Sequence, residues 1–500
     1  MSLEELLDYK TVDIPSFMEV RTEKIEPITF NSSDLRYVFR LEPSGFLDEN
    51  TLLQFKLNRS ANATNDELRV NSATGALGAI KRVIFRVGDF IINDTDGVEQ
   101  LMPLLKMMKK RRVDVNSYEA YYYGNQFHSK TIETADSTYG QIEPDDALNG
   151  YNYTSGTANS LKITTTPTSN FKYGIQLGVL IPALKDVLEG QGFPLYLCSE
   201  YKVYIEIEFN QPSVYLNADT ATTRRAIDAD LDAPSEVQIL ADYLIYPTSV
   251  LENARKMTQK EGGLVLDFLN WVKVEQQLTV NAGSVVLVDD NATYLANGVE
   301  QDLTTKKDFR IGMENKELHT LLMVKQKTTT DSEAKGKVFL GSRMEGLTSE
   351  SIQIKVNGVD VFQEPVNNTS SQFDQVFMSL GYHDLQVERP CFFNDPNSIV
   401  AGYTSFDSGL QGTYKPLMYD ARVYDQGILG SGTQIGRYPL LVRYEATPAS
   451  KIITYGESDS GSQSCSQEDG DYDVNFYCAL SRRAVIQSDS NGAMNITVLS

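Results

Sequence analysis

The sequence predicts an all-β protein that contains two consecutive β domains. Short runs of alternating or β-branched apolar residues recur along all 500 residues, and clusters of Gly, Asn, Asp and Ser separate them. This pattern is typical of β-strands joined by turns. Two pairs of similar segments occur in the same order in the two halves of the chain, which indicates a duplicated domain. With 41% hydrophobic residues, the chain is long enough to bury a core in each domain.

The predicted strands are spread over both halves of the chain. In the segment 201–209, YKVYIEIEF, apolar residues occupy every second position. One face of this strand is therefore expected to pack in a core, while the other, which carries Glu206 and Glu208, faces water. Short helices are expected over 97–108 and 180–188. The strands are expected over residues 24–30, 51–57, 79–92, 172–178, 201–209, 237–246, 264–280, 318–325, 351–362, 419–424, 438–446 and 474–486.

The similar segments define the domain organisation. AIKRVIFRVGDFIINDTDGVEQLMPLL and SIQIKVNGVDVFQEPVNNTSSQFDQVFMSL each contain a β-rich run, a turn at Gly88 or Gly358, an apolar strand, a polar stretch and a short amphipathic helix. In the second pair, 192–213 and 436–450, a Gly–aromatic–Pro entry precedes an alternating strand. The charged segment 248–263 interrupts the strand pattern and ends in a glycine pair, which predicts a boundary near residue 255. The expected parts are an N-terminal arm (1–23), a first β domain (24–255) and a second β domain (256–500). Two long polar connections, 114–170 and 211–234, are expected to carry surface contacts.

The charge and the cysteines exclude several classes of partner and site. The net charge is −22 and the isoelectric point is near 4.7. Binding to a nucleic-acid backbone needs clustered Lys and Arg, so direct sequence-specific nucleic-acid recognition is not expected. The four cysteines have no C-x-x-C spacing, which argues against a zinc ribbon or a redox pair. The acidic N-terminus does not resemble a signal peptide, and synthesis in the cytosol is expected.

The sequence contains no recognisable catalytic motif. The histidines, His128, His319 and His383, are far apart, and the motifs of nucleophilic hydrolases, phosphate loops and dinucleotide sites are absent. EDGDYD at 468–473 begins like a calcium loop but lacks the later Gly and Glu, so an exposed loop is the preferred interpretation. No pair of carboxylates has the spacing that would single out a β-sandwich glycosidase. We therefore predict no enzyme activity, no cofactor and no metal.

Several segments resemble the major capsid proteins of virophages and polinton-like viruses. They are GALGAIKRVIFRVGDFIIN, IQLGVLIPALKDVLEGQGFPLYLCSEYKVYIEIEF, RYPLLVRYEAT and NFYCALSRRAVIQSDSNGAMNITV. The resemblance implies two consecutive eight-stranded antiparallel jelly rolls with short helices and long loops. It also implies a homotrimer that presents six barrels as a pseudo-hexameric capsomer of an icosahedral double-stranded DNA virus. The implied partners are neighbouring capsomers and penton and minor capsid proteins, in a virion capsid whose subunits are made in the host cytosol.

Two interpretations remain open beside this one. Tyr-rich loops on β scaffolds also suit sugar recognition, so a two-domain carbohydrate-binding or viral adhesin module is the alternative function. A dense basic cluster follows the helix expected at 97–108 and could contact an acidic face of a neighbouring subunit. Favourable placement of cations at a helix C-terminus is the simpler explanation for it. The cluster consists of Lys106, Lys109, Lys110, Arg111 and Arg112.

Overall fold

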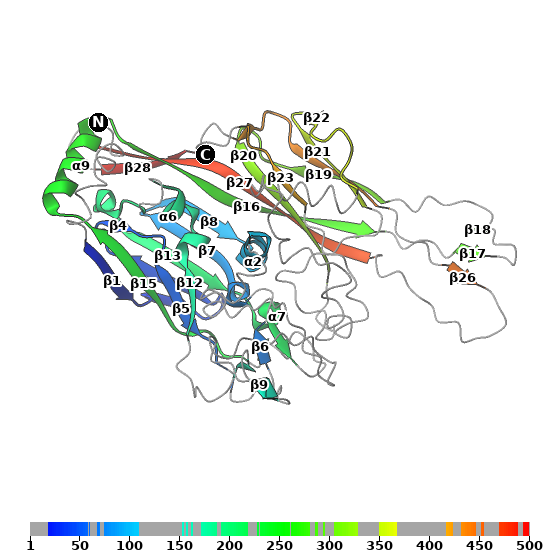
Figure 1. Cartoon of the computed structure of the whole chain (residues 1–500), viewed down its shortest axis with the longest axis horizontal. Helices are drawn as coiled ribbons and strands as arrows, with labels where there is room; N and C mark the ends of the chain where they lie inside the picture. The colour runs from blue at the N-terminus through cyan, green and yellow to red at the C-terminus, as the bar shows by residue number, and fades with distance from the viewer. Residues whose placement is uncertain are drawn as a thin grey trace.

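The computed structural model contains two β-sandwiches that lie side by side (Figure 1). It describes residues 19–58, 60, 68–70, 75–109, 153–154, 157–158, 162–163, 172–187, 192–218, 228–229, 231–260, 262–280, 286–288, 294–295, 305–328, 350–367, 417–423, 432–446, 452–454, 470–488 and 494–499. Within these residues, no strand before residue 248 pairs with a strand after residue 260. Each sandwich is therefore built from its own sheets.

The first sandwich consists of a β1 sheet and a β3 sheet. The β1 sheet has the order β1–β15–β5–β12, with β4 also paired to β15, and the β3 sheet has the order β2–β3–β13–β7–β8. Their bounds are β1 Glu19–Ile25, β2 Thr29–Asn31, β3 Arg36–Leu41, β4 Phe46–Leu47, β5 Leu52–Lys56, β7 Ile80–Val87, β8 Phe90–Asp96, β12 Tyr173–Gln176, β13 Val203–Phe209 and β15 Ser235–Ile245.

The second sandwich consists of a β16 sheet and a β19 sheet. The β16 sheet has the order β16–β27–β20–β23, with β24 paired to β20 and β28 to β27, and the β19 sheet has the order β19–β25–β21–β22. Their bounds are β16 Leu264–Val280, β19 Thr305–Ile311, β20 Glu317–Lys327, β21 Glu350–Val356, β22 Val359–Asp360, β23 Leu417–Asp420, β24 Thr433–Gln434, β25 Leu440–Ala446, β27 Gly470–Ser488 and β28 Met494–Leu499.

Helices and small sheets lie in the connections between these strands. The helices are α2 Val98–Lys109, α5 Leu177–Leu180, α6 Pro182–Asp186, α7 Pro212–Tyr215 and α9 Thr248–Lys260, with single 3₁₀ turns at Gly75–Ala79 and Leu195–Cys198. One small sheet contains β6 Leu68–Val70, β11 Lys162–Ile163 and β14 Leu216–Ala218; another contains β17 Val286–Val288, β18 Tyr294–Leu295 and β26 Ile452–Thr454. A short hairpin joins β9 Tyr153–Thr154 to β10 Thr157–Ala158.

The two sandwiches repeat one topology. Counted along the described chain without the short accessory strands, each has eight strands in the order first–eighth–third–sixth in one sheet and second–seventh–fourth–fifth in the other. The fourth and fifth strands meet at Gly88 in the first sandwich and at Gly358 in the second, and both glycines have positive φ, +59° and +84°. A left-handed backbone favours glycine, so the same turn chemistry recurs. The similar segments found in the sequence thus occupy equivalent places.

Most of the predicted strands are confirmed. The segment 264–280 coincides with β16, and the predicted helix at 97–108 corresponds to α2. The strand predicted at 24–30 is replaced by β1 and β2, and the segment 36–41, which was not predicted, forms β3. The interpretation of 468–473 as an exposed loop was wrong for its described part, because β27 begins at Gly470 and pairs with β16 there. The division into domains near residue 255 falls within α9 and remains a proposal.

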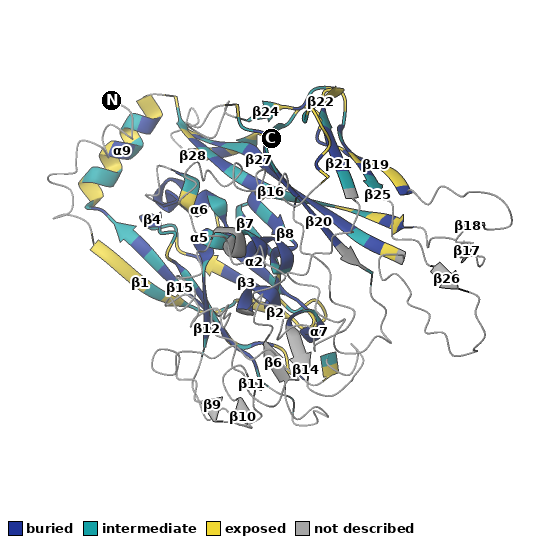
Figure 2. Cartoon of the chain, turned by 45° about the vertical axis from the view of Figure 1, so that its right-hand side comes forward, coloured by how far each residue is buried: buried dark blue, intermediate teal, exposed yellow. Residues whose placement is uncertain are grey.

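Each sandwich has its own apolar core between its sheets. Phe39, Phe55 and Phe85 are fully buried in the first, and Phe309 and Phe476 in the second. The first core extends beyond its own sandwich, because Leu322 and Tyr477 of the second sandwich belong to it. Figure 2 shows the consequence: β1 is exposed at the outside of the molecule, while β20 and β27 are buried over much of their length and β16 is largely intermediate.

Candidate assembly faces

The two sandwiches meet at a junction, where the β16 sheet covers one side of the first sandwich. The strand β16 packs on β8 and α6. Phe268 and Tyr477 of the second sandwich are fully buried with residues of α2 and α6. The covered strand β8 is an edge strand of its sheet. Edge strands expose unpaired backbone groups, so this junction also protects β8 from unwanted pairing.

Buried amide side chains complete this junction. Asn270 Oδ1 accepts hydrogen bonds from the backbone N–H of Asp94 at 3.1 Å and from Asn93 Nδ2 at 3.2 Å. Gln100 Oε1 accepts hydrogen bonds from Asn475 Nδ2 and from the Tyr477 hydroxyl, both at 2.8 Å. Buried polar groups are costly unless paired. The network therefore fixes how the two sandwiches meet.

Gly97 and Glu99 lie at the centre of the junction. Gly97 has a φ of +69°, and a Cβ at this position would lie 2.6 Å from the Tyr477 hydroxyl oxygen and 2.8 Å from Lys273 Cδ. Glu99 is half-buried, and its Oε2 lies out of solvent without a hydrogen-bond partner among the described residues. Burial raises the pKa of the Glu99 carboxyl group to about 7, although the positive charge of Lys273 acts to lower it. Its carboxyl group therefore titrates near neutral pH.

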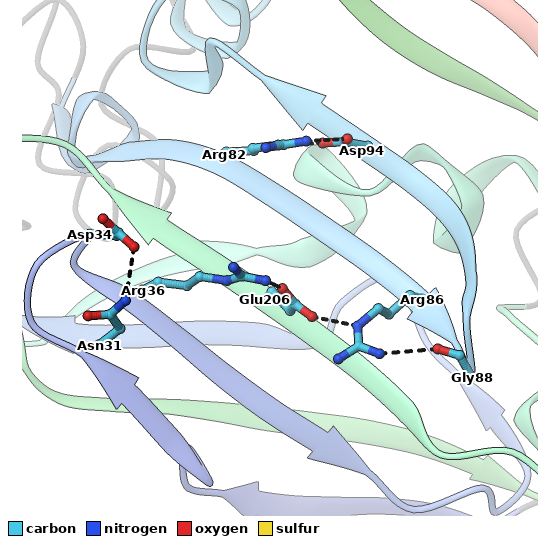
Figure 3. Close-up of polar contacts among 8 residues, drawn as sticks. All are labelled: Asn31, Asp34, Arg36, Arg82, Arg86, Gly88, Asp94 and Glu206. Atoms are coloured by element: carbon cyan, nitrogen blue, oxygen red, sulfur yellow. Dashed lines mark hydrogen bonds and ion pairs between the residues drawn. The ribbon is translucent and has the colours of Figure 1, made fainter.

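The outer face of the β3 sheet carries a network of charges (Figure 3). Glu206 was predicted to face water, and this was wrong: the residue points outward but is only 4% exposed. Arg86 Nε contacts Glu206 Oε1 at 2.5 Å, and Arg36 forms an ion pair with Glu206 Oε2. The Arg86 guanidinium also lies 4.3 Å from the centre of the Tyr204 ring. The arginine stems cover the carboxylate, which alternation alone does not reveal.

The described residues contain no cluster of metal-ligating side chains. Within them, no group of three or more His, Cys, Asp and Glu side chains could hold a metal ion. His319 is buried, with its Nε2 3.6 Å from Glu317 Oε1. In the part of the chain that the structure describes, no helix is long and apolar enough to cross a membrane. His128 and His383 lie outside the described residues.

The basic cluster cannot be placed in the same way. Arg111, Arg112 and Lys110 lie outside the described residues, and α2 includes Lys106 and Lys109 without their side chains being described. Their contact with a neighbouring subunit stays a prediction.

Comparison with solved structures identifies the architecture. The PBCV-1 protein VP54, fitted into a reconstruction of the virophage Sputnik, aligns over 97% of both chains with a TM-score of 0.53 and 10% identity. A cryo-EM structure of the Sputnik virophage aligns over 96% of this chain and 88% of the other, with a TM-score of 0.52 and 8% identity. Comparison with protein-family models and with curated protein sequences finds no match.

The chain has the double jelly-roll fold. At 8–10% identity, this conclusion concerns the fold, and it confirms the two jelly rolls expected from the sequence. The strand order found in each sandwich, with eight strands in two facing sheets, is also the jelly-roll arrangement.

Four long connections of the second jelly roll lie at one end. In an antiparallel sandwich, the connections after the first, third, fifth and seventh strands leave from the same end. In the second jelly roll these are residues 281–304, 328–349, 361–416 and 447–469, whereas the short turns 312–316 and 357–358 and the segment 421–439 lie at the opposite end. The helix α9 joins the two rolls at the end of the short turns (Figure 1). We call these the loop end and the short end.

Two further sides of the double jelly roll carry exposed apolar residues. The outer face of the β1 sheet presents Val20, 57% exposed, beside the half-buried Leu244. On the described part of the second jelly roll, the three most exposed large apolar residues are Val359 in β22 and Val423 and Tyr438 on either side of β24. The sequence analysis did not identify these residues. The sequence does show that the apolar residues Val359 and Tyr438 lie close to glycines, Gly358 and Gly436, and an apolar residue beside a turn could have indicated an exposed position.

Proposed function

We propose that the protein is a structural major capsid protein that forms homotrimeric, pseudo-hexameric capsomers in the icosahedral shell of a double-stranded DNA virus. The observation that carries the proposal is the repetition of one jelly-roll topology in two units joined side by side in a single chain. Three such chains supply six similar blocks, which suits a pseudo-hexagonal tile. The role is structural and needs no catalytic residue.

The polarity of the fold suggests how such a tile is oriented. Longer connections at the loop end provide variable surface, as loops on a rigid scaffold generally do. The short end carries α9, the tight turns at 312–316 and 357–358 and the segment 421–439, and we assign it to the inner side of the shell. Neighbouring capsomers would contact the sides, and penton and minor capsid proteins are further proposed partners. Synthesis in the host cytosol and residence in the virion capsid complete the proposal.

Native mass spectrometry and electron microscopy of the purified full chain test this function. We expect a particle of about three times the 55.8 kDa chain mass, with a pseudo-hexagonal outline in projection. Expression at high concentration is expected to yield shell-like assemblies. A stable monomer that forms no assemblies, and that binds glycans on an array, would instead favour the carbohydrate-binding alternative.

A further inference from the structure

The eighth strand of each roll shares one of its two edges between two other strands. In the first roll, β15 pairs with β1 along one edge, and with β5 and then β4 along the other. In the second roll, β27 pairs with β16 along one edge, and with β20 and then β28 along the other. The strands β4 and β28 therefore hold the same place in the two rolls, although they come from different parts of the chain.

The reason for this difference is the length of one connection. The strand β4 belongs to the connection between the second and third strands of the first roll, residues 42–51. The same connection of the second roll is only residues 312–316, which is too short to add a strand along β27 and return. Without β28, the edge of β27 at residues 483–488 would have no partner strand among the described residues. An unpaired edge is a template for the addition of a strand.

The side chains of β28 contact the first roll, although its backbone pairs with the second. Ile496 is 2% exposed and belongs to the first core, and the half-buried Val498 packs against that core. Their register places them beside apolar residues of β27 and β16, in the rows Leu264–Ile486–Ile496 and Leu266–Ala484–Val498. All these residues belong to the first core or pack against it. The strand β28 thus widens by one strand the apolar surface that the second roll places on the first.

Tyr201 provides a second contact between β28 and the first roll. Its hydroxyl donates a hydrogen bond to Asn495 Oδ1 at 2.8 Å. Its ring lies close to the turn between β7 and β8, because a Cβ on Gly88 would be 2.8 Å from Tyr201 Cδ1, and the Phe90 ring centre lies 6.4 Å away. At the equivalent turn of the second roll, nothing lies within 4 Å of a Cβ placed on Gly358. The turn that contacts β28 is therefore covered, whereas its counterpart is open among the described residues.

We infer that the edge of β27 at residues 483–488, together with β8 and the 3₁₀ turn Leu195–Cys198, forms a docking site for an extended peptide strand, and that residues 494–499 occupy it as an exchangeable strap. The site takes a segment with free backbone N–H and C=O groups and apolar side chains at alternate positions, as in strand addition to a sheet edge. Each roll has its eight strands without β28. The strap can therefore leave and rebind while both rolls stay folded, as local opening of an edge element allows. Its release opens one end of the junction between the rolls. The inference concerns a single chain and does not depend on the proposed trimer.

Hydrogen exchange of the full chain, followed by mass spectrometry, tests the strap. Ile496→Ala removes its most buried apolar contact, and Thr497→Ala, at the adjacent exposed position of the same strand, is the matched control. We expect Ile496→Ala to accelerate exchange about 30-fold or more in residues 494–499, because truncation of a buried Ile is costly. Exchange should also accelerate in residues 195–198 and 483–488, while the β1 sheet keeps its wild-type rates. Thr497→Ala should leave all these rates unchanged.

Peptide binding tests whether the site accepts a strand in trans. A fluorescein-labelled peptide with the sequence of residues 494–499 is titrated with the full-length Ile496→Ala variant and with the wild type, and its polarisation is measured. We expect the variant to bind the peptide about tenfold or more tightly than the wild type, whose own strap competes at a high effective concentration. The same peptide with Asp in place of Ile496 should not bind.

The two experiments also define the results that would overturn the inference. Exchange in Ile496→Ala that accelerates equally throughout both rolls would show that β28 is an integral part of the fold and not a strap. Unchanged exchange in residues 195–198 would show that the first roll does not form part of the site. A peptide that binds neither protein would show that the site does not exchange its strand.

Discussion

The β1 sheet and the β16 sheet hold the same place in their jelly rolls but have different surroundings. In the β16 sheet, β16 and β27 have 17 and 19 residues, and the sheet is buried against two cores. In the β1 sheet, β1 and β15 have 7 and 11 residues, and the outer face stays partly exposed. The two rolls have the same architecture because they share one topology. Strand length and the side chains on the outer face of the sheet determine which face forms the junction between the two rolls.

The largest expected effect comes from a change at the centre of that junction. Gly97→Ala places a Cβ against the Tyr477 hydroxyl in a left-handed backbone position, and strain combined with overpacking should cost about 3 kcal/mol of unfolding free energy. The measurement is urea denaturation followed by fluorescence of Trp271, the single tryptophan of the chain, which packs on the first core from β16.

Gly358→Ala is the control for this experiment. Gly358 also has a positive φ, +84°, but nothing lies within 4 Å of a Cβ placed there. Backbone strain alone should then cost about 1 kcal/mol. Equal losses for the two variants would show that the junction does not depend on the close approach at Gly97.

A second comparison concerns the central outward position of the seventh strand in each roll. In the first roll this is Glu206, buried between Arg36 and Arg86. In the second roll it is Arg443, half exposed and paired with Asp308 at 3.1 Å. Glu206→Gln should lower the unfolding free energy by about 2 kcal/mol, because it removes the buried charge partner of two arginines. Arg443→Gln should cost about 0.5 kcal/mol or less, since exposed ion pairs contribute little. Thermal denaturation of both variants measures the contrast, and equal losses would mean that burial of Glu206 adds nothing.

The sequence predicted the repeated β pattern well because that signal is local. The alternation of apolar and polar residues identified β13. Gly88 and Gly358 identified two equivalent turns, which the structure confirms. The burial of Glu206 could not be predicted, since it depends on arginines from two other strands, 120 and 170 residues away. The junction between the two sandwiches could not be predicted from the sequence either. Asn270, Gln100 and Asn475 look like ordinary polar residues until the fold brings them together.

A pH dependence of the same junction is expected to have a smaller effect than the substitutions Gly97→Ala and Glu206→Gln. Burial raises the pKa of Glu99 from its ordinary value of 4.5 to about 7. Between these values the folded state binds more protons than the unfolded state, so the contribution of Glu99 lowers stability as pH rises from about 5 to about 7.5. Because water reaches part of the side chain, we expect a loss of about 1–2 kcal/mol rather than the full value of the shift.

Glu99→Gln isolates this contribution, because the neighbouring Lys273 and Asp96 and the other titrating groups are retained. The variant should match the wild type near pH 5 and exceed its unfolding free energy by about 1–2 kcal/mol near pH 8. Urea denaturation of both proteins across this range, followed by Trp271 fluorescence, gives the difference at each pH. A difference that stays constant with pH would mean that the Glu99 carboxyl does not titrate in this window. The junction would then rest on its amide network alone, and its contrast with the exposed β1 sheet would be one of packing and not of charge.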